Sequence, residues 1–344
     1  IAVQICRRRA VVKIDFFTVN PDENVGSYRI WVKDLSRSLS DIGCESTIHI
    51  ADGTVNCVDQ DVIILDKSTY KLASEIKKIF KNSKIGAINI PCDYHSPDID
   101  FVIVGSVEEY ISMSKYSNVF IYPLIERKFE NVEPKEHKET SVMKFCFHGH
   151  WPHIPKFSPY ISRALDLYHN KIPSELHIIT GEDKNPYGLK FVPSSMPVFF
   201  HNYKKINFTE LVSNFDIGLV PNVTPIENIS PEIVAYQHPN LGLYETDFNI
   251  RFKNKTNGGR AYVFYQHGIP VIHDLSPSSF DFMSRSGIYC CGHDTESYLR
   301  EMIRLTDHSF RNKVARENTR AFKRDFNPVN HASSLVEFIK EVML

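Results

Sequence analysis

The sequence predicts an α/β protein built from two doubly wound, Rossmann-like domains that face a cleft. Short apolar segments rich in β-branched residues alternate with amphipathic helical segments, which is the pattern of parallel sheets covered by helices. A charged run at 126–142 interrupts this alternation, and the alternation starts again at residue 143. Doubly wound sheets bind ligands beyond the carboxyl ends of their strands, so the cleft is the expected site.

Composition narrows the class of protein. The chain has 344 residues, which favours two domains, and its 42% hydrophobic and 24% charged residues are typical of a globular protein. A net charge of −1 argues against a general nucleic-acid-binding surface. Seven cysteines without a CxxC pair argue against a disulfide framework or a cysteine zinc site and favour a reducing compartment. We expect a cytoplasmic protein, because no apolar run reaches the ~20 residues of a membrane span and no signal peptide is visible.

The first domain is predicted to span residues 1–130. One helix is expected at 28–43, where apolar residues recur at helical spacing and Gly43 follows as a stop signal. A second amphipathic helix is expected at 70–82. The predicted strands are short and apolar, as buried parallel strands are. They lie at 10–19, 45–50, 61–66, 84–90, 101–106 and 118–124.

The second domain is predicted to span residues 143–325 and to follow a solvated linker at 126–142. A long segment at 222–254 shows little periodicity, so we expect it to be functional or flexible. The predicted strands lie at 143–149, 174–181, 216–221, 269–273 and 287–290, and the predicted helices at 158–170, 207–215, 258–268, 295–305 and 308–325.

The start of the helix at 258–268 has the composition of an anion site. Asn257 is a suitable cap, and Gly258 and Gly259 allow another group to approach the backbone of the first turn. That turn presents N–H groups and the positive end of the helix dipole. Lys255 adds a point charge and Arg260 adds a bidentate fork, a combination that suits a diphosphate better than a single carboxylate. Judged from the residue spacing alone, the alternative to an anion site is an ordinary connection between a helix and a strand that carries surface cations.

This stretch also carries a resemblance to a known family. The pattern K-x-N-x-x-R-A-x6-G-I-P-V-I at 255–272 resembles the donor-site segment of the GT-B glycosyltransferases, and is closest to the large, mostly retaining, nucleotide-sugar-dependent family with many bacterial members. The segments at 24–43, 215–221 and 298–327 resemble that family's first loop and helix, the strand before its donor loop, and its closing helices.

The resemblance implies a GT-B fold, with an acceptor-side first domain and a nucleotide-sugar-binding second domain. It implies that the last helix, 326–344, returns to the first domain. The implied reaction is transfer of a sugar from a UDP- or GDP-sugar to a glycan or lipid-linked saccharide, without cofactor or metal, while Lys255 and Arg260 stabilise the leaving diphosphate. The family often has acidic residues on both sides of this helix, but this chain has Val263 and Phe264 near the position of the second one. The contact that this acidic residue makes with the donor is therefore not carried over to this chain.

Two predicted site segments lie in the first domain. Gly26 and Ser27 stand at the first strand–helix junction, where a glycine permits close approach of a sugar. A role in the turn alone is the alternative. Asp93 and His95 follow the strand at 84–90 and are the candidate base if the reaction inverts configuration. A polar turn without catalytic function is the competing interpretation.

Further donor contacts are expected at His148, Gly149 and His150, which follow the first strand of the second domain. Together with His153 these histidines also suggest zinc, but no cysteine or acid completes a ligand set, so hydrogen bonds to phosphate or backbone are favoured.

An acidic pair, Asp98 and Asp100, has the D-x-D spacing of a metal site in other glycosyltransferases. Because the pair precedes a strand instead of ending one, a cap or turn is the favoured interpretation and no metal site is predicted.

Two other functions remain open at this point. A nucleotide-sugar epimerase on the same fold would need acid and base groups on both sides of the sugar. A non-catalytic sugar-nucleotide-binding domain of a larger protein would need only the anion site. The net charge of −1 favours no nucleic-acid partner, and peripheral association with the inner face of a membrane stays open.

Overall fold

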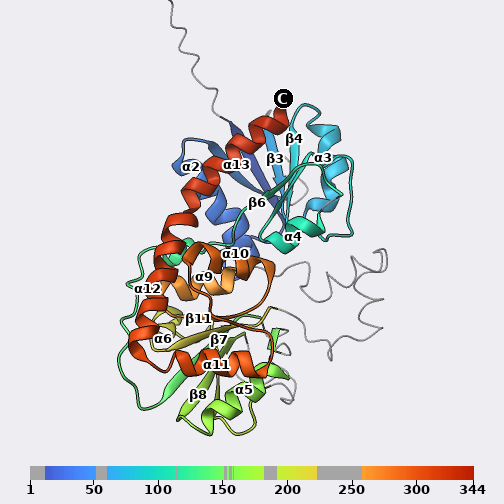
Figure 1. The fold of residues 1–344 in the computed structure, drawn as a ribbon. Coiled ribbons are helices and arrows are strands. Elements are labelled where there is room, and N and C mark those ends of the chain that lie inside the picture. Colours follow the sequence, from blue (N-terminus) through green and yellow to red (C-terminus); the bar gives the residue numbers. More distant parts are fainter. Residues whose placement is uncertain are drawn as a thin grey trace, which may run out of the picture. The chain divides into compact units, whose positions relative to one another are not determined.

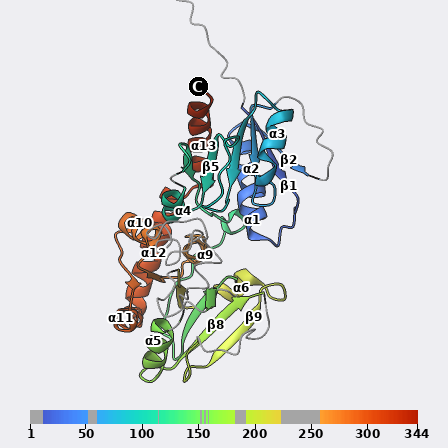
Figure 2. The same cartoon turned by 90° about the vertical axis from the view of Figure 1, so that its right-hand side faces the viewer.

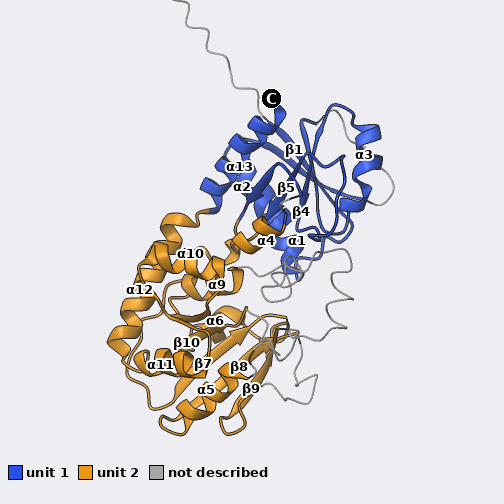
Figure 3. Ribbon diagram, turned by 45° about the vertical axis from the view of Figure 1, so that its right-hand side comes forward, with its two compact units in different colours: residues 1–104, 113–122, 328–344 blue, residues 105–112, 123–327 orange. Residues whose placement is uncertain are grey.

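The computed structural model describes residues 12–51, 60–113, 115–150, 153–154, 157, 159–181, 192–222 and 258–344. The chain divides into two compact units, shown in blue and orange in Figure 3. Unit 1 comprises residues 1–104, 113–122 and 328–344, and unit 2 comprises residues 105–112 and 123–327. Each unit contains one parallel sheet of six strands, which confirms the predicted α/β class with two doubly wound sheets.

The sheet of unit 1 has the strand order β2-β1-β3-β4-β5-β6. Figure 1 labels its strands β3, β4 and β6. All of its pairs are parallel, with Phe17 opposite His49 and Phe16 opposite Ile64. Every residue of β3 and β5 is buried, as expected when helices cover both faces. The strands are β1 (Lys13–Thr18), β2 (Glu45–Ile50), β3 (Val62–Leu65), β4 (Lys84–Ile88), β5 (Phe101–Val104) and β6 (Val119–Ile121).

Helical segments pack on this sheet. The helix predicted at 28–43 is one helical stretch made of α1 (Gly26–Tyr28), a π-helical turn (Arg29–Asp34) and α2 (Leu35–Asp41). A 3₁₀ turn (Tyr70–Leu72) leads into α3 (Ala73–Ile79). The last helix, α13 (Pro328–Met343), packs against α2, and its Phe338 contacts Phe101 and Phe120 with ring centroids 5.9 and 5.3 Å apart.

The sheet of unit 2 has the order β12-β11-β10-β7-β8-β9, again with parallel pairs. The strand predicted at 287–290 is wrong. Gly287 has φ +70° and ends a helix, and the short pairing with β11 begins only at Cys291. The strands are β7 (Met143–His148), β8 (Ser174–Thr180), β9 (Val198–Asn202), β10 (Ile217–Val220), β11 (Val271–Asp274) and β12 (Cys291–Gly292).

Two apolar layers cover the faces of this second sheet. Figure 2 labels the helices that contribute to them. One layer contains α5 (Tyr160–His169) and α11 (Thr295–Arg304). The other contains α6 (Phe208–Val212), α9 (Gly259–Gln266) and α10 (Pro277–Ser286). The long helix α12 (His308–Asp325) supplies side chains to both layers. A further helix, α4 (Val107–Ser112), contacts α10, where the Glu108 carboxylate accepts hydrogen bonds from the Ser278 N–H and hydroxyl.

The charged segment at 126–142 belongs to unit 2 and is partly buried there, so it is not the solvated linker along its whole length that the sequence predicted. His137 is only 2% exposed, and its Nε2 donates to the Gly268 carbonyl at 2.9 Å. The Lys135 ammonium donates to the Phe215 carbonyl at 2.7 Å and to the Asp216 carboxylate at 3.1 Å. Lys135 and His137 therefore have buried partners, which a charge pattern alone does not reveal.

Two absences hold for the described part of the chain. None of the helices there combines the length and apolarity needed to cross a bilayer. No disulfide joins any of the cysteines there.

Candidate functional site

The strand order of unit 2 creates a topological switch point between β7 and β10. From β7 the chain proceeds to β8 and β9 on one side, and then crosses back to β10, β11 and β12 on the other side. The loops that follow β7 and β10 therefore leave the sheet in opposite directions. Ligands of open α/β sheets bind in the crevice that such diverging loops create at the carboxyl ends of the strands.

Arg260, in the first turn of α9, lies at this switch point and contacts both diverging loops. Its guanidinium carbon is 5.6 Å from the centroid of the Phe147 ring, which belongs to β7. Its Nη2 donates to the Pro221 carbonyl at 3.1 Å and to the Asn222 side-chain oxygen, both just after β10. Burial lowers the pKa of Arg260 to about 10, partly opposed by the Asp274 charge, so the guanidinium stays protonated at neutral pH.

One donor of this guanidinium lacks an acceptor. The Nη1 atom of Arg260 is buried and has no hydrogen-bond partner among the residues that the structure describes. A buried, charged donor left unsatisfied is costly, and such atoms in folded proteins require an explanation. An anionic ligand oxygen at this position would supply the missing acceptor.

Gly149 brings the loop after β7 against Arg260. Its φ of +143° favours glycine, and a Cβ at this position would lie 3.0 Å from Cδ of Arg260. Its N–H donates to the Ile179 carbonyl at 3.0 Å, which continues the β7–β8 ladder by one residue. The predicted residues Gly149 and Arg260 therefore lie side by side, and their shared role toward a donor stays a prediction.

His148 stabilises the first turn of α9, which contains Arg260. Its Nε2 donates to the Arg260 carbonyl oxygen at 2.9 Å, and its ring packs on Phe264 and Phe208. Burial lowers the pKa of His148 to about 4, so the imidazole is neutral at physiological pH. The structure thus places His148 as a support of α9, and a contact of its other ring nitrogen with phosphate stays a prediction.

This neutral histidine has a consequence for acid stability. His148 charges readily when unfolded, with an ordinary pKa near 6.5, but only near pH 4 when folded. Its contribution to stability is therefore complete above about pH 6.5 and is lost as the pH falls toward 4, by about 2 kcal/mol at pH 5. We expect His148→Gln, which cannot titrate but can still donate, to lose less unfolding free energy between pH 7 and pH 5.

Urea unfolding at pH 7, 6 and 5 measures this difference. The control is His150→Gln, which removes an exposed histidine of the same loop and should follow the wild-type curve. Parallel pH profiles for wild type and His148→Gln would contradict the assigned protonation state.

The start of α9 differs from the predicted cap. Gly258 is the N-cap residue, one position later than expected, and its carbonyl accepts from the Tyr262 N–H at 3.0 Å. A Cβ on Gly258 would lie 2.5 Å from the Tyr262 ring, so this glycine is required by packing. Gly259 opens the helix. Lys255 and Asn257, the other predicted residues of this motif, lie outside the described residues.

The candidate metal ligands do not assemble into a metal site. Within the described ranges, no group of three or more His, Cys, Asp or Glu side chains is arranged to hold a metal ion. His150 is exposed, and its carbonyl accepts from the His153 N–H at 3.1 Å. Of the D-x-D pair, Asp98 contacts the Ser74 hydroxyl, while Asp100 accepts from the Ile85 N–H at 2.8 Å. These contacts agree with the cap-or-turn interpretation.

The remaining predicted residues belong to unit 1. Gly26 opens α1, with Ser27 next to it. Asp93 lies in a turn after β4, and the exposed His95 stacks on Tyr116 with ring centroids 5.2 Å apart. Each pair therefore follows the carboxyl end of a strand, as expected. Their roles toward acceptor or proton transfer stay predictions.

Sequence reasoning missed several residues of the switch point. Pro221, Asn222 and Asp274 form the polar surroundings of Arg260, although nothing in their local pattern marks them. Thr180, at the carboxyl end of β8, has a buried hydroxyl that lacks a partner within the described part of the chain. Their shared signal is position, because each stands at or just after the carboxyl end of a strand.

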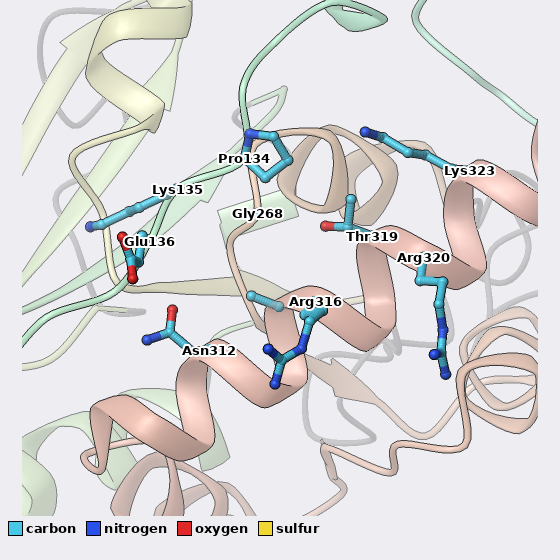
Figure 4. Close-up of a pocket in the computed structure, with 10 residues that line it drawn as sticks. Pro134, Lys135, Glu136, Gly268, Asn312, Arg316, Thr319, Arg320 and Lys323 are labelled. Carbon is cyan, nitrogen blue, oxygen red and sulfur yellow. The ribbon is translucent and has the colours of Figure 1, made fainter.

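A groove of about 580 Å³ also lies in unit 2, but away from this site (Figure 4). It runs between the segment Pro134–Glu136 and one face of α12, with Gly268 between them. Gly268 precedes β11, so the groove lies near the amino ends of the strands, whereas Arg260 lies at their carboxyl ends. The groove is lined by Pro134, Lys135, Glu136, Gly268, Asn312, Ala315, Arg316, Thr319, Arg320 and Lys323.

Two parallel doubly wound sheets, one with a cationic helix start at its switch point, define a two-domain Rossmann-like α/β protein. Comparison with solved structures specifies the fold. One similar structure is a glycosyltransferase from Rickettsia africae ESF-5, with 12% identity, a TM-score of 0.61, and coverage of 97% of this chain and 99% of that chain. A second is a sucrose-phosphate synthase from Thermosynechococcus elongatus, with 12% identity, a TM-score of 0.60, and coverage of 96% of this chain and 99% of that chain. A third is HepE from Anabaena in complex with UDP-glucose, with 10% identity, a TM-score of 0.54, and coverage of 96% of this chain and 99% of that chain. No family model and no curated protein matches the sequence.

These similarities extend over nearly the whole chain. The protein therefore has the GT-B fold, which confirms the prediction made from the resemblance. At 10–12% identity the similarity shows the fold, and the activity has to be inferred from the site.

Proposed function

We propose that the protein is a glycosyltransferase that binds the diphosphate of a nucleotide-sugar donor at the β7–β10 switch point of unit 2. The observation that supports this most strongly is the buried Nη1 of Arg260, a charged donor without an acceptor in the described chain. It lies beside the amino-terminal turn of α9, where the helix dipole favours negative charge. Gly149 keeps the loop after β7 within contact distance of this guanidinium.

In the proposed reaction the bond between the anomeric carbon of the sugar and the β-phosphate oxygen breaks, and the acceptor oxygen forms a bond to that carbon. The proton of the acceptor hydroxyl passes to the departing diphosphate if configuration is retained, or to a protein base if it is inverted. Negative charge then grows on the departing diphosphate. Arg260 and the first turn of α9 are already oriented toward that charge, so they stabilise it more in the transition state than in the ground state. Lys255 is proposed to add a second cation, and together these groups take the place of a metal.

The proposed donor is a UDP-hexose. Two similar structures support this choice, because HepE is described in complex with UDP-glucose and a trehalose-6-phosphate structure from E. coli is described as bound with UDP-2-fluoro glucose (TM-score 0.52, 12% identity). A GDP-sugar is the alternative donor. The proposed acceptor is a glycan or a lipid-linked saccharide, and the proposed location is the cytoplasm. If the reaction inverts configuration, Asp93 or His95 is the proposed base.

The purified protein incubated with UDP-glucose, UDP-galactose, UDP-N-acetylglucosamine and GDP-mannose tests this proposal. Each donor is supplied with and without a panel of oligosaccharide acceptors, and with and without EDTA. We expect release of UDP or GDP that rises with acceptor, a glycosylated product by mass spectrometry, and no loss of rate in EDTA.

The other outcomes separate the alternatives. Isomerisation of the sugar nucleotide without nucleotide release, followed by NMR, would identify an epimerase. Nucleotide binding without turnover of any donor would identify a binding domain. Failure to bind UDP, GDP or any donor would refute the proposed site altogether.

A further inference from the structure

Asp274 closes β11 at the carboxyl edge of the unit 2 sheet and is 7% exposed. Both of its carboxylate oxygens have partners from distant parts of the chain. One oxygen accepts from the Asn222 N–H at 2.5 Å, and the other accepts from the Tyr298 hydroxyl. The backbone carbonyl of Asp274 accepts from the Ser276 N–H at 2.9 Å. A buried carboxylate with this many donors has a single, well-defined orientation.

The Asn222 contact continues to Arg260. Asn222 is 3% exposed, and its side-chain oxygen accepts from Nη2 of Arg260, while the neighbouring Pro221 carbonyl accepts from the same atom at 3.1 Å. A chain of hydrogen bonds therefore runs from Tyr298 through Asp274 and Asn222 to the guanidinium. Because Nη2 is held in place, the planar guanidinium can present Nη1 in only one direction.

The geometry points to Asp274 as a positioning residue for donor binding: it holds the Pro221–Asn222 segment in the arrangement that aims the Arg260 guanidinium at the donor diphosphate. This inference rests on the proposed function of the site. Asp274 does not touch the ligand in this scheme. Asp274 contributes to affinity because it restricts Arg260 before the ligand arrives, so less conformational freedom of Arg260 is lost when the diphosphate binds.

Two substitutions at one position separate the positioning role from a purely structural one. Asp274→Ala removes the acceptor for the Asn222 N–H. Asp274→Asn keeps the shape, can still direct an oxygen at that N–H, and can direct its NH₂ group at the Tyr298 oxygen. The Kd values are measured for UDP, and for uridine, which has no phosphate. We expect Asp274→Ala to weaken UDP binding about 10-fold or more, with little change for uridine, and Asp274→Asn to restore most of the affinity.

A second measurement needs no nucleotide. The Arg260 Nε–H resonance of the ligand-free protein, identified by its loss in Arg260→Lys, reports the order of the guanidinium. We expect this resonance to shift or broaden in Asp274→Ala and to return toward its wild-type position in Asp274→Asn. Near-ultraviolet circular dichroism checks that both variants are folded.

The results distinguish the two levels of the proposal. If a folded Asp274→Ala variant binds UDP as tightly as the wild type, or if its Arg260 resonance is unchanged, then the role of Asp274 is overturned. The proposed function is left standing by either result. Equal losses for UDP and uridine overturn it as well, because they indicate general disruption. Wild-type protein that binds neither UDP nor GDP overturns the proposed function, and the assignment of Asp274 to donor binding falls with it.

Discussion

Replacing Arg260 by alanine is expected to weaken UDP binding about 100-fold, equivalent to about 3 kcal/mol, and to lower kcat/KM for the donor by at least as much. The guanidinium contacts both Phe147, which lies near the end of β7, and the Pro221–Asn222 segment that follows β10. Its removal eliminates both the charge and the two-pronged donor at the switch point. Isothermal titration with UDP and initial rates with the preferred donor measure the two effects.

Arg260→Lys is the informative companion to this variant. Lysine keeps the positive charge but loses the planar fork, so it cannot hold Pro221 and Asn222 and also address the ligand. We expect it to recover less than half of the lost binding free energy.

The groove beside α12 supplies the matched control for Arg260. Arg316→Ala removes an exposed arginine that lines this groove, and it should leave UDP affinity unchanged. If Arg316→Ala weakens UDP binding while Arg260→Ala does not, then the nucleotide binds in the groove and the switch-point site is wrong.

Replacing Asp216 by alanine is expected to have the largest effect on stability, about 3 kcal/mol of unfolding free energy. The buried Asp216 carboxylate accepts from the Lys144 N–H at 3.0 Å and pairs with the Lys135 ammonium at 3.1 Å. Burial alone would raise the pKa of this carboxyl, but the His137 side chain, the Lys135 charge and the Lys144 N–H hold the pKa below its ordinary value. Without Asp216, the ammonium remains largely buried without its counter-charge, and its pKa, already lowered by burial, falls further.

Urea unfolding at pH 7 measures this loss, and a double variant tests its cause. Asp216→Ala with Lys135→Met removes both charges, so we expect it to be more stable than Asp216→Ala alone. The control is Asp281→Ala, which breaks an exposed pair with Arg285 on α10 and should cost less than about 1 kcal/mol. A double variant no more stable than Asp216→Ala would show that the buried charge of Lys135 is not the source of the loss.

Much of the fold was predictable because it follows from local periodicity. The helix expected at 308–325 coincides with α12, and the apolar segment at 61–66 contains the fully buried β3. Short runs of this kind form strands because both faces of a parallel sheet are covered. The prediction was wrong where the decisive contact is distant. Residues 126–142 look like a solvated linker until Asp216 and Gly268 provide partners for their polar groups.

For the site, the sequence by itself determined the chemistry available at the start of α9. Two glycines followed by an arginine at a helix start favour an anion site, since helix dipole and side-chain charge are local properties. The same reasoning located Gly149 and His148 after a strand of the second domain. It gave no reason to select Asn222, Asp274 or Thr180.

Only the tertiary structure decided which groups surround Arg260. Asn222 is 38 residues away from Arg260 in the sequence and His148 is 112 residues away, yet both bond to it. Their meeting depends on the strand order, which puts β7 and β10 side by side and carries their loops apart. Sheet order is set by the burial of whole strands and helices, a property of the complete chain, so no short segment encodes it.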